Sequence, residues 1–218
     1  MIDFLLIHTF YTNSVGNFVT IFFPMTDFQI RQAFHDVILK DEHQCTNTFV
    51  VDELGLMNGK SRADIAVLNG KMIGYEIKSD RDSLTRLPSQ VLAYNRIFDK
   101  AFIIVDEKHL NKAFQIIPDW WGIYVIRQLN SQSFQFEYFR EGECNKGQDS
   151  YSIVQLLWKE EAFEIATTIF QCNLKKQACK HEINVALTTN SNVNNLSKIV
   201  IEYLKKRQAW RKDPKALL

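Results

Sequence analysis

The chain has little cysteine: four residues among 218, with no Cys-x-x-Cys pair. Such spacing excludes the disulfide framework of a small secreted domain, and a reducing cytoplasm is the simpler setting. A zinc set made of Cys172, Cys179 and His181 is disfavoured, because six residues between the two cysteines is not a usual zinc-finger spacing. We therefore expect Cys172 and Cys179 to be ordinary buried thiols; Cys45 and Cys144 are scattered elsewhere in the sequence.

A long apolar run is also missing. Residues 1–24 are apolar and aromatic, but they lack the basic start of a signal peptide, and polar side chains such as Asp3 and His8 interrupt them. A membrane span requires about 20 predominantly apolar residues, so we expect none and no membrane partner. Thr26-Asp27-Phe28-Gln29 follows as a capping-box pattern for a helix start. We expect the functional protein to begin near Met25, and residues 1–24 to be an ill-fitting extension that can be deleted without loss of folding.

Strong net charge is absent too, since the formal charge is +1 and the pI is about 7.7. The charge is nevertheless unevenly distributed: Lys175 to Leu218 carries ten basic and three acidic residues, which leaves +7 there and −6 before it. A basic tail on an acidic body suggests a polyanion partner. The alternative is that Lys205, Lys206 and Arg207 are the solvated end of a helix, where cations suit the helix dipole.

The composition is that of a globular protein, with 46% hydrophobic and 23% charged residues, so a disordered or fibrous chain is excluded. Hydrophobic periodicity predicts helices at 26–40, 82–100 and 108–117, and Pro88 places a helix start or a kink inside the second of them. It also predicts a mostly helical region after 150, with 153–170 and 195–210. Short β-branched or apolar runs predict strands that begin at 49 and cover 63–68, 72–78, 101–105, 122–127 and 133–140. Asn58-Gly59 and Asn69-Gly70 are turn signals. The predicted class is α/β with a helical C-terminal extension, divided into residues 1–24, 25–150 and 151–218.

Three charged residues lie inside the predicted central strands. Glu76 and Lys78 are two apart on one strand, so their side chains share a face and Ile77 points to the other. Asp64 occupies the partner strand of the same hairpin. Because the rest of these strands is apolar, the strands are expected to be buried. Burying a charged side chain costs free energy unless the charge is paired, binds a metal or faces a cleft. Two converging carboxylates suit Mg²⁺ or Mn²⁺, which can polarise a phosphodiester, and Lys78 can position the attacking water and balance developing charge.

Asp64, eleven intervening residues and Glu76-Ile77-Lys78 resemble the D…(D/E)xK signature of the PD-(D/E)xK, or restriction-endonuclease-like, nuclease superfamily. The resemblance implies an αβββαβ core with a central mixed sheet flanked by helices. It also implies that Asp64, Glu76 and the backbone of Ile77 hold the metal. Many relatives similar to RecB-type exonucleases carry Q-x-x-x-Y on the next helix, here Gln90 and Tyr94, which would brace the site or touch the nucleic-acid strand.

The wider sequence around these motifs looks like the poorly characterised sce7726 group of the superfamily, and it is similar to the MmcB-like DNA-repair group; the resemblance covers roughly residues 26–128. It makes Glu53 the candidate for an additional acidic metal ligand. Ala63 replaces the proline of the signature's PD dipeptide. An iron–sulfur cluster, present in some relatives, is disfavoured because the cysteines after residue 100 are too widely spaced.

Other residues keep two interpretations. Lys60, Arg62 and Arg86 are candidates for phosphate contacts or for surface solvation. His35 and His43 invite a metal interpretation, but each is isolated in the sequence, so satisfied helix or surface histidines are expected. Trp120-Trp121 can stack on bases, although core packing is favoured in this apolar context.

The sequence thus predicts a cytoplasmic, Mg²⁺- or Mn²⁺-dependent nuclease that hydrolyses DNA in repair, mobile-element or phage-defence biology. An alternative is an inactive nuclease-fold module that binds nucleic acid or a protein, since fold does not fix function. Two further partners are possible from the sequence: a second copy of the chain in a homodimer, and another protein docked on the C-terminal helices.

Overall fold

The computed structural model describes residues 11–12, 18–19, 26–130 and 133–207. Two short strands, β1 (Tyr11–Thr12) and β2 (Phe18–Val19), pair antiparallel. Most of the predicted extension at residues 1–24 therefore lies outside the described residues, as does the end of the helix predicted to reach residue 210.

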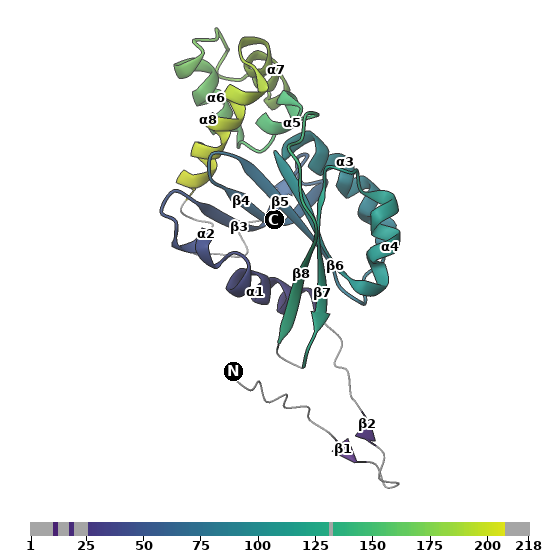
Figure 1. The fold of residues 1–218 in the computed structure, drawn as a ribbon. Helices are drawn as coiled ribbons and strands as arrows, with labels where there is room; N and C mark the ends of the chain where they lie inside the picture. The colour runs from purple at the N-terminus through teal and green to yellow at the C-terminus, as the bar shows by residue number, and fades with distance from the viewer. Residues whose placement is uncertain (1–10, 13–17, 20–25, 131–132, 208–218) are drawn as a thin grey trace.

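A six-stranded mixed sheet forms the centre of the protein (Figure 1). The first three strands are antiparallel, the third to fifth run parallel, and the last is an antiparallel edge strand. These strand directions follow from the connections. Short turns join the antiparallel neighbours, and helices form the crossovers between the parallel ones. In spatial and chain order the strands are β3 (Phe49–Leu56), β4 (Ser61–Leu68), β5 (Met72–Lys78), β6 (Lys100–Asp106), β7 (Gly122–Gln128) and β8 (Phe134–Arg140).

Two N-terminal helices, α1 (Asp27–Val37) and α2 (Lys40–Gln44), lie on one side of the sheet. The predicted capping box is confirmed. The backbone amide of Gln29 donates to Oγ1 of Thr26 at 3.3 Å, and the backbone amide of Thr26 donates to Oε1 of the Gln29 side chain at 3.1 Å. Ile30 and Phe34 of α1 pack on Tyr75 and on other side chains of this face. One helix was expected over 26–40, but α1 ends at Val37 and the short α2 follows.

The opposite face carries a larger core. Leu87, Val91 and Tyr94 of α3 (Leu87–Ile97), which follows a 3₁₀ turn η1 (Leu84–Arg86), pack there, and α4 (Glu107–Ile116) lies beside α3. Pro88 occupies the first turn of α3, where its missing amide hydrogen costs no helical hydrogen bond. Of the two expectations for Pro88, the helix start is therefore confirmed and the kink is not, and α3 begins later than residue 82.

The C-terminal helices gather at one end of the sheet (Figure 1) and continue the larger core. The helix predicted over 153–170 is divided, and Thr167 and Thr168 turn their hydroxyls back to helix carbonyls in its last part, a contact known to distort helices. The elements are α5 (Ser150–Val154), α6 (Lys159–Glu164), a π-helical turn η2 (Ile165–Ile169), α7 (Lys180–Asn190) and α8 (Val193–Lys206).

The predicted α/β class is therefore confirmed as a six-stranded central sheet flanked by helices, with further helices at the C-terminus. Both turn signals are confirmed as well, because Asn58, Gly59 and Gly70 adopt positive φ values of 56°, 81° and 89°. Within the described ranges, none of the helices is long and apolar enough to span a membrane.

Candidate functional site

Glu76 and Lys78 end β5 with both side chains buried, at 0% and 5% exposure of the residues. Their spacing of two places them on one face, and the Lys78 ammonium makes an ion pair with Oε1 of Glu76. The predicted proximity of this carboxylate and this ammonium is thus present in the structure. The pairing offsets part of the cost of burying these two charges.

Asp64 lies on the neighbouring strand, just beyond the regular β4–β5 pairing, whose last pair is Ile65 with Tyr75. Its Oδ2 accepts a hydrogen bond of 2.7 Å from the backbone amide of Ile77. The Asp64 side chain thus accepts the hydrogen bond of the Ile77 amide beyond the last backbone pair of β4 and β5. This contact holds the Asp64 carboxylate beside the Glu76–Lys78 pair.

Two residues of α3 hold Glu76 from the helix side. Gln90 donates from Nε2 to Oε1 of Glu76, and the Tyr94 hydroxyl donates to Oε2 at 2.8 Å. The same hydroxyl lies 3.1 Å from the carbonyl of Tyr75. Gln90 and Tyr94 are four apart on the helix, so both reach the same carboxylate. Since Tyr94 is fully buried, the structure supports bracing rather than contact with a nucleic-acid strand.

The two carboxyl groups share an environment that disfavours their charged forms. Burial, followed by the negative charge of Glu76, raises the pKa of Asp64 well above its ordinary value, against the opposing hydrogen bond from Ile77. Burial also raises the pKa of Glu76, although Lys78 and the hydrogen bonds from Tyr94 and Gln90 act in the other direction. Electrostatically, this pair would be stabilised by an added cation.

Glu53 occupies a break in β3. Asp52 pairs with Ile65 and Leu54 pairs with Ala63, so the β3–β4 pairing skips the one position that Glu53 and Asp64 share. Glu53 has a positive φ of 57°, and Val51 and Leu54, three residues apart, both pack into the larger core. A regular strand alternates faces every residue, so this irregularity turns the strand locally.

The Glu53 carboxylate is engaged by two guanidinium groups, Arg31 from α1 and Arg62 from β4. Arg31 also pairs with Asp27 at 2.8 Å, one helical turn away. Burial lowers the pKa of Arg31, but the charges of Glu53 and Asp27 outweigh it and raise the value overall. Glu53 thus reaches the site as predicted, held in an ion-pair network, and its assignment as a metal ligand stays a prediction.

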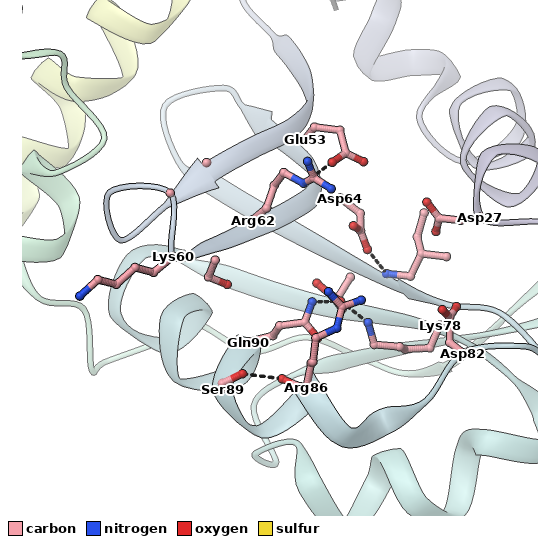
Figure 2. A pocket seen from close by; sticks show the side chains of 15 residues that line it. Asp27, Glu53, Lys60, Arg62, Asp64, Lys78, Asp82, Arg86, Ser89 and Gln90 are labelled. Atoms are coloured by element: carbon pink, nitrogen blue, oxygen red, sulfur yellow. Dashed lines mark hydrogen bonds and ion pairs between the residues drawn. The ribbon is translucent and has the colours of Figure 1, made fainter. Parts of the chain in front are cut away.

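Except for Arg31 and Tyr94, the site residues described above line one pocket of about 540 Å³ (Figure 2). Asp27 and Asp82 line it but were not anticipated as site residues; the spacing of four between Asp27 and Arg31 was the available signal for part of this network. The lining contains no aromatic side chain. It consists of Asp27, Glu53, Gly55, Gly59, Lys60, Ser61, Arg62, Asp64, Glu76, Ile77, Lys78, Asp82, Arg86, Ser89 and Gln90.

The donor set fits a hard divalent cation. Asp64 and Glu76 offer carboxylate oxygens at one end of the sheet, and the described residues hold no group of three or more His, Cys, Asp or Glu side chains arranged as metal ligands. Mg²⁺ is commonly held by only one or two carboxylates, with waters and substrate phosphates completing its shell. Two protein carboxylates are therefore compatible with Mg²⁺ or Mn²⁺, and unsuited to a closed zinc site.

The structure corrects several expectations. Cys179 is exposed and Cys172 is partly exposed, so buried thiols were wrongly expected at these two positions. Cys45 and Cys144 are exposed as well, and all four cysteines are free. Arg207 is buried against Glu161 and Trp158 rather than solvated.

Two further expectations concern aromatic and histidine side chains. The preference for core packing at Trp120-Trp121 is confirmed, since Trp121 is fully buried and Trp120 packs against the same core. His35 and His43 are not isolated: Nδ1 of His35 lies 2.9 Å from Nε2 of His43.

The fold and pocket define a mixed α/β protein with a charged site at one end of its sheet. The family model described as bacteriophage P4 protein cII matches residues 26–214. The chain therefore belongs to the bacteriophage P4 protein cII family.

Among individual proteins, this chain is similar to "Protein cII" of Enterobacteria phage P4, at 30% identity over 112 residues. The match covers 51% of this chain and 42% of that protein, so less than half of the relative's length is spanned. Among solved structures, the SPO1766 protein of unknown function from Silicibacter pomeroyi matches 70% of this chain and 100% of its own. Its TM-score is 0.39 and its sequence identity 15%, too distant to carry a structural argument.

Proposed function

We propose that this protein is a metal-dependent phosphodiester hydrolase of the PD-(D/E)xK type, with DNA as its substrate. The observation that carries the proposal is the convergence of Asp64, Glu76 and Lys78 in one pocket. The helix and strand order from α1 through β6 is α-α-β-β-β-α-β, which agrees with the αβββαβ core of the restriction-endonuclease-like fold when the short α2 is counted with α1.

Asp64, Glu76 and the backbone carbonyl of Ile77 are the groups that would hold Mg²⁺ or Mn²⁺. When bound, the ion would stabilise negative charge on the phosphate and lower the pKa of a coordinated water. The raised pKa values of both carboxyl groups support this assignment, because a cation would offset the repulsion and burial that cause them. Glu53, opposite Asp64, is a further candidate ligand once its guanidinium partners shift.

The protein's own side chains have distinct tasks in this proposal. Lys78 positions the attacking water and balances charge that develops on the phosphate. Gln90 and Tyr94 hold the Glu76 carboxylate in place, so they act as positioning residues. Lys60 and Arg86 supply positive charge at the pocket for neighbouring phosphates.

The decisive experiment compares the full chain with Lys78→Ala and Asp64→Asn variants on linear duplex, circular duplex and single-stranded DNA. Each reaction contains Mg²⁺, Mn²⁺ or a chelator. We expect metal-dependent cleavage by the wild type, and a loss of about 10²–10³-fold in the Lys78→Ala variant, the magnitude typical for removal of one charge-stabilising donor. The Lys112→Ala variant, which removes an exposed lysine on α4, is the matched control and should cleave normally.

Cleavage that persists in both site variants would contradict the proposal, because a contaminating nuclease would then explain the activity. A purified wild type that cleaves none of these DNA substrates with Mg²⁺ or Mn²⁺ would equally contradict the proposal.

A second function is a binding module without turnover. The observation that favours it is that both carboxylate oxygens of Glu76 already have partners within the protein, Lys78 and Gln90 on Oε1 and Tyr94 on Oε2. In that case the wild type and the Lys78→Ala variant would bind DNA, or a protein partner, to the same degree without divalent ions and without cleavage. The C-terminal helices α5–α8 are the candidate surface for a protein partner, and a homodimer is the simplest assembly to test by light scattering.

A further inference from the structure

Two histidines and an aspartate form a chain of contacts outside the pocket. Nε2 of His35 lies 2.9 Å from Oδ1 of Asp52, and Nδ1 of His35 lies 2.9 Å from Nε2 of His43. His35 is in the last turn of α1, His43 is in the last turn of α2, and Asp52 is on β3. Three separate elements therefore meet at two imidazole rings.

The aspartate fixes the tautomer of His35. An ionised carboxylate only accepts hydrogen bonds, so Nε2 of His35 carries the hydrogen, and Nδ1 of the neutral ring presents its lone pair to His43. A histidine that binds a metal typically donates its other ring hydrogen to a carboxylate in this way, which orients the ring and strengthens the ligand. Only 14% of the His35 side chain is exposed, so the orientation is also restrained by packing.

We propose that Nδ1 of His35 and Nε2 of His43 bind one transition-metal ion of the zinc and nickel class, with Asp52 as the orienting carboxylate. Without metal, the hydrogen on Nε2 of His43 bridges the two rings. With metal, the neutral His43 carries its hydrogen on Nδ1 instead, so both facing nitrogens become ligands and no proton has to leave.

The separation of the two nitrogens needs little change, and each ring has to turn so that its lone pair points at the ion. Zinc–nitrogen bonds of about 2.0–2.1 Å place two imidazole nitrogens only a few tenths of an ångström farther apart than the observed contact. His43 is exposed and α2 is short, so this side chain can make that adjustment. Because no set of three or more His, Cys, Asp or Glu ligands exists in the described part of the chain, waters would complete the coordination.

This site is chemically distinct from the carboxylates in the pocket. Imidazole suits zinc, nickel and copper, whereas Mg²⁺ prefers oxygen ligands. An ion between His35 and His43 would tie α2 to α1, and Asp52 would connect both to the strand segment next to Glu53. The proposal is therefore independent of whether the pocket hydrolyses DNA.

The test is calorimetric titration of untagged, chelator-treated full chain with Zn²⁺ and, separately, Ni²⁺. We expect saturable binding of about one equivalent to the imidazole pair, lost in His43→Gln and in His35→Ala. Glutamine can still donate a hydrogen bond to Nδ1 of His35, so the His43→Gln variant keeps the fold while it removes the ligand. Asp52→Asn should weaken binding by about 10–100-fold, as loss of an orienting carboxylate does.

Two controls separate this site from others. Glu76→Gln removes a pocket carboxylate and should retain the imidazole-dependent binding, while His181→Ala removes a histidine that contacts Tyr151 and should also bind normally. Wild type without saturable Zn²⁺ or Ni²⁺ binding would overturn the proposal, as would undiminished binding by the His43→Gln variant. Absence of DNA cleavage would leave it unaffected.

Discussion

The carboxylate of Asp64 accepts a 2.7 Å hydrogen bond from the backbone amide of Ile77, the residue between Glu76 and Lys78. This single contact couples two strands at the point where their regular pairing has ended. It brings the aspartate to the buried Glu76–Lys78 pair, although eleven residues separate Asp64 from Glu76 in the sequence.

The first prediction concerns pH. Because the pKa values of Asp64 and Glu76 are raised in the folded protein, the folded state retains protons that the unfolded state has already lost. Without divalent ions, the free energy of unfolding should therefore fall as pH rises from the ordinary carboxyl pKa values, 3.8 and 4.5, through the raised ones. Each unit of pKa difference contributes about 1.4 kcal/mol.

Urea unfolding across this pH range measures the effect. Asp64→Asn and Glu76→Gln should flatten the decline, and added Mg²⁺ or Mn²⁺ should reduce it by binding the ionised pair. A wild-type profile that rises with pH over this range, and that the two substitutions leave unchanged, would contradict the assignment.

The second prediction tests how Glu76 is braced. Tyr94→Phe removes the hydroxyl that lies 2.8 Å from Oε2 of Glu76 and leaves a buried acceptor short of a partner. We expect the free energy of unfolding to fall by about 1–3 kcal/mol, and the pKa of Glu76 to rise further. Tyr138→Phe is the control, since that side chain is half exposed on β8 and should change stability little. Equal effects of the two substitutions would show that the contact with Glu76 is not the cause.

The third prediction separates two roles of Glu53. Glu53→Ala and Glu53→Gly both remove the carboxylate that pairs with Arg31 and Arg62. Only glycine adopts the observed φ of 57° without steric cost, so the glycine variant should be more stable than the alanine variant by about 1 kcal/mol. Urea midpoints of the two variants provide the measurement, and an alanine variant at least as stable as the glycine variant would refute the strain at this position.

The fourth prediction concerns phosphate contacts and rests on nucleic-acid binding. Lys60 and Arg86 line the pocket with exposed side chains, and neither makes an ion pair with a described residue, whereas Arg62 and Lys78 are paired. Replacing Lys60 or Arg86 by alanine should lower DNA affinity similarly for different sequences. Each substitution should also reduce the slope of log affinity against log salt concentration by about 1.

Fluorescence anisotropy with labelled oligonucleotides, in chelator and at several salt concentrations, measures both quantities. The exposed Lys112 on α4 again supplies the control. A variant whose loss of affinity depends strongly on base sequence would indicate that the side chain contacts bases. A variant with an unchanged salt slope would show that the side chain is solvated and does not contact a phosphate.

Local rules were sufficient for much of the fold. The capping box at Thr26, the turns at Asn58-Gly59 and Asn69-Gly70, and the strands with Glu76 and Asp64 all depend on neighbouring residues, so their patterns could be recognised. Helix boundaries were less accurate at residues 37–40 and 153–170, because tertiary packing decides where a helix breaks.

The site was predictable in part for the same reason. Glu76, Lys78 and Asp64 stand out as charges within apolar strands, and Gln90 and Tyr94 as a pair on one helical face. Asp27 and Asp82 carry no such local contrast, and they line the pocket only when α1 and the segment after β5 pack beside the sheet. Arg31 reaches Glu53 through the same packing of α1.

The sequence by itself determined the alternation of strands and helices, and it determined which charged residues would be costly to bury, because periodicity and turn chemistry act over a few residues. Only the tertiary structure decided which of those charges meet. The Arg31–Glu53–Arg62 ion pairs, the approach of Asp64 to Ile77 and the contact of His35 with His43 and Asp52 each join residues of different helices and strands. Such contacts form because α1 and the strands bury their apolar faces together, a condition set by the whole fold and by no short segment.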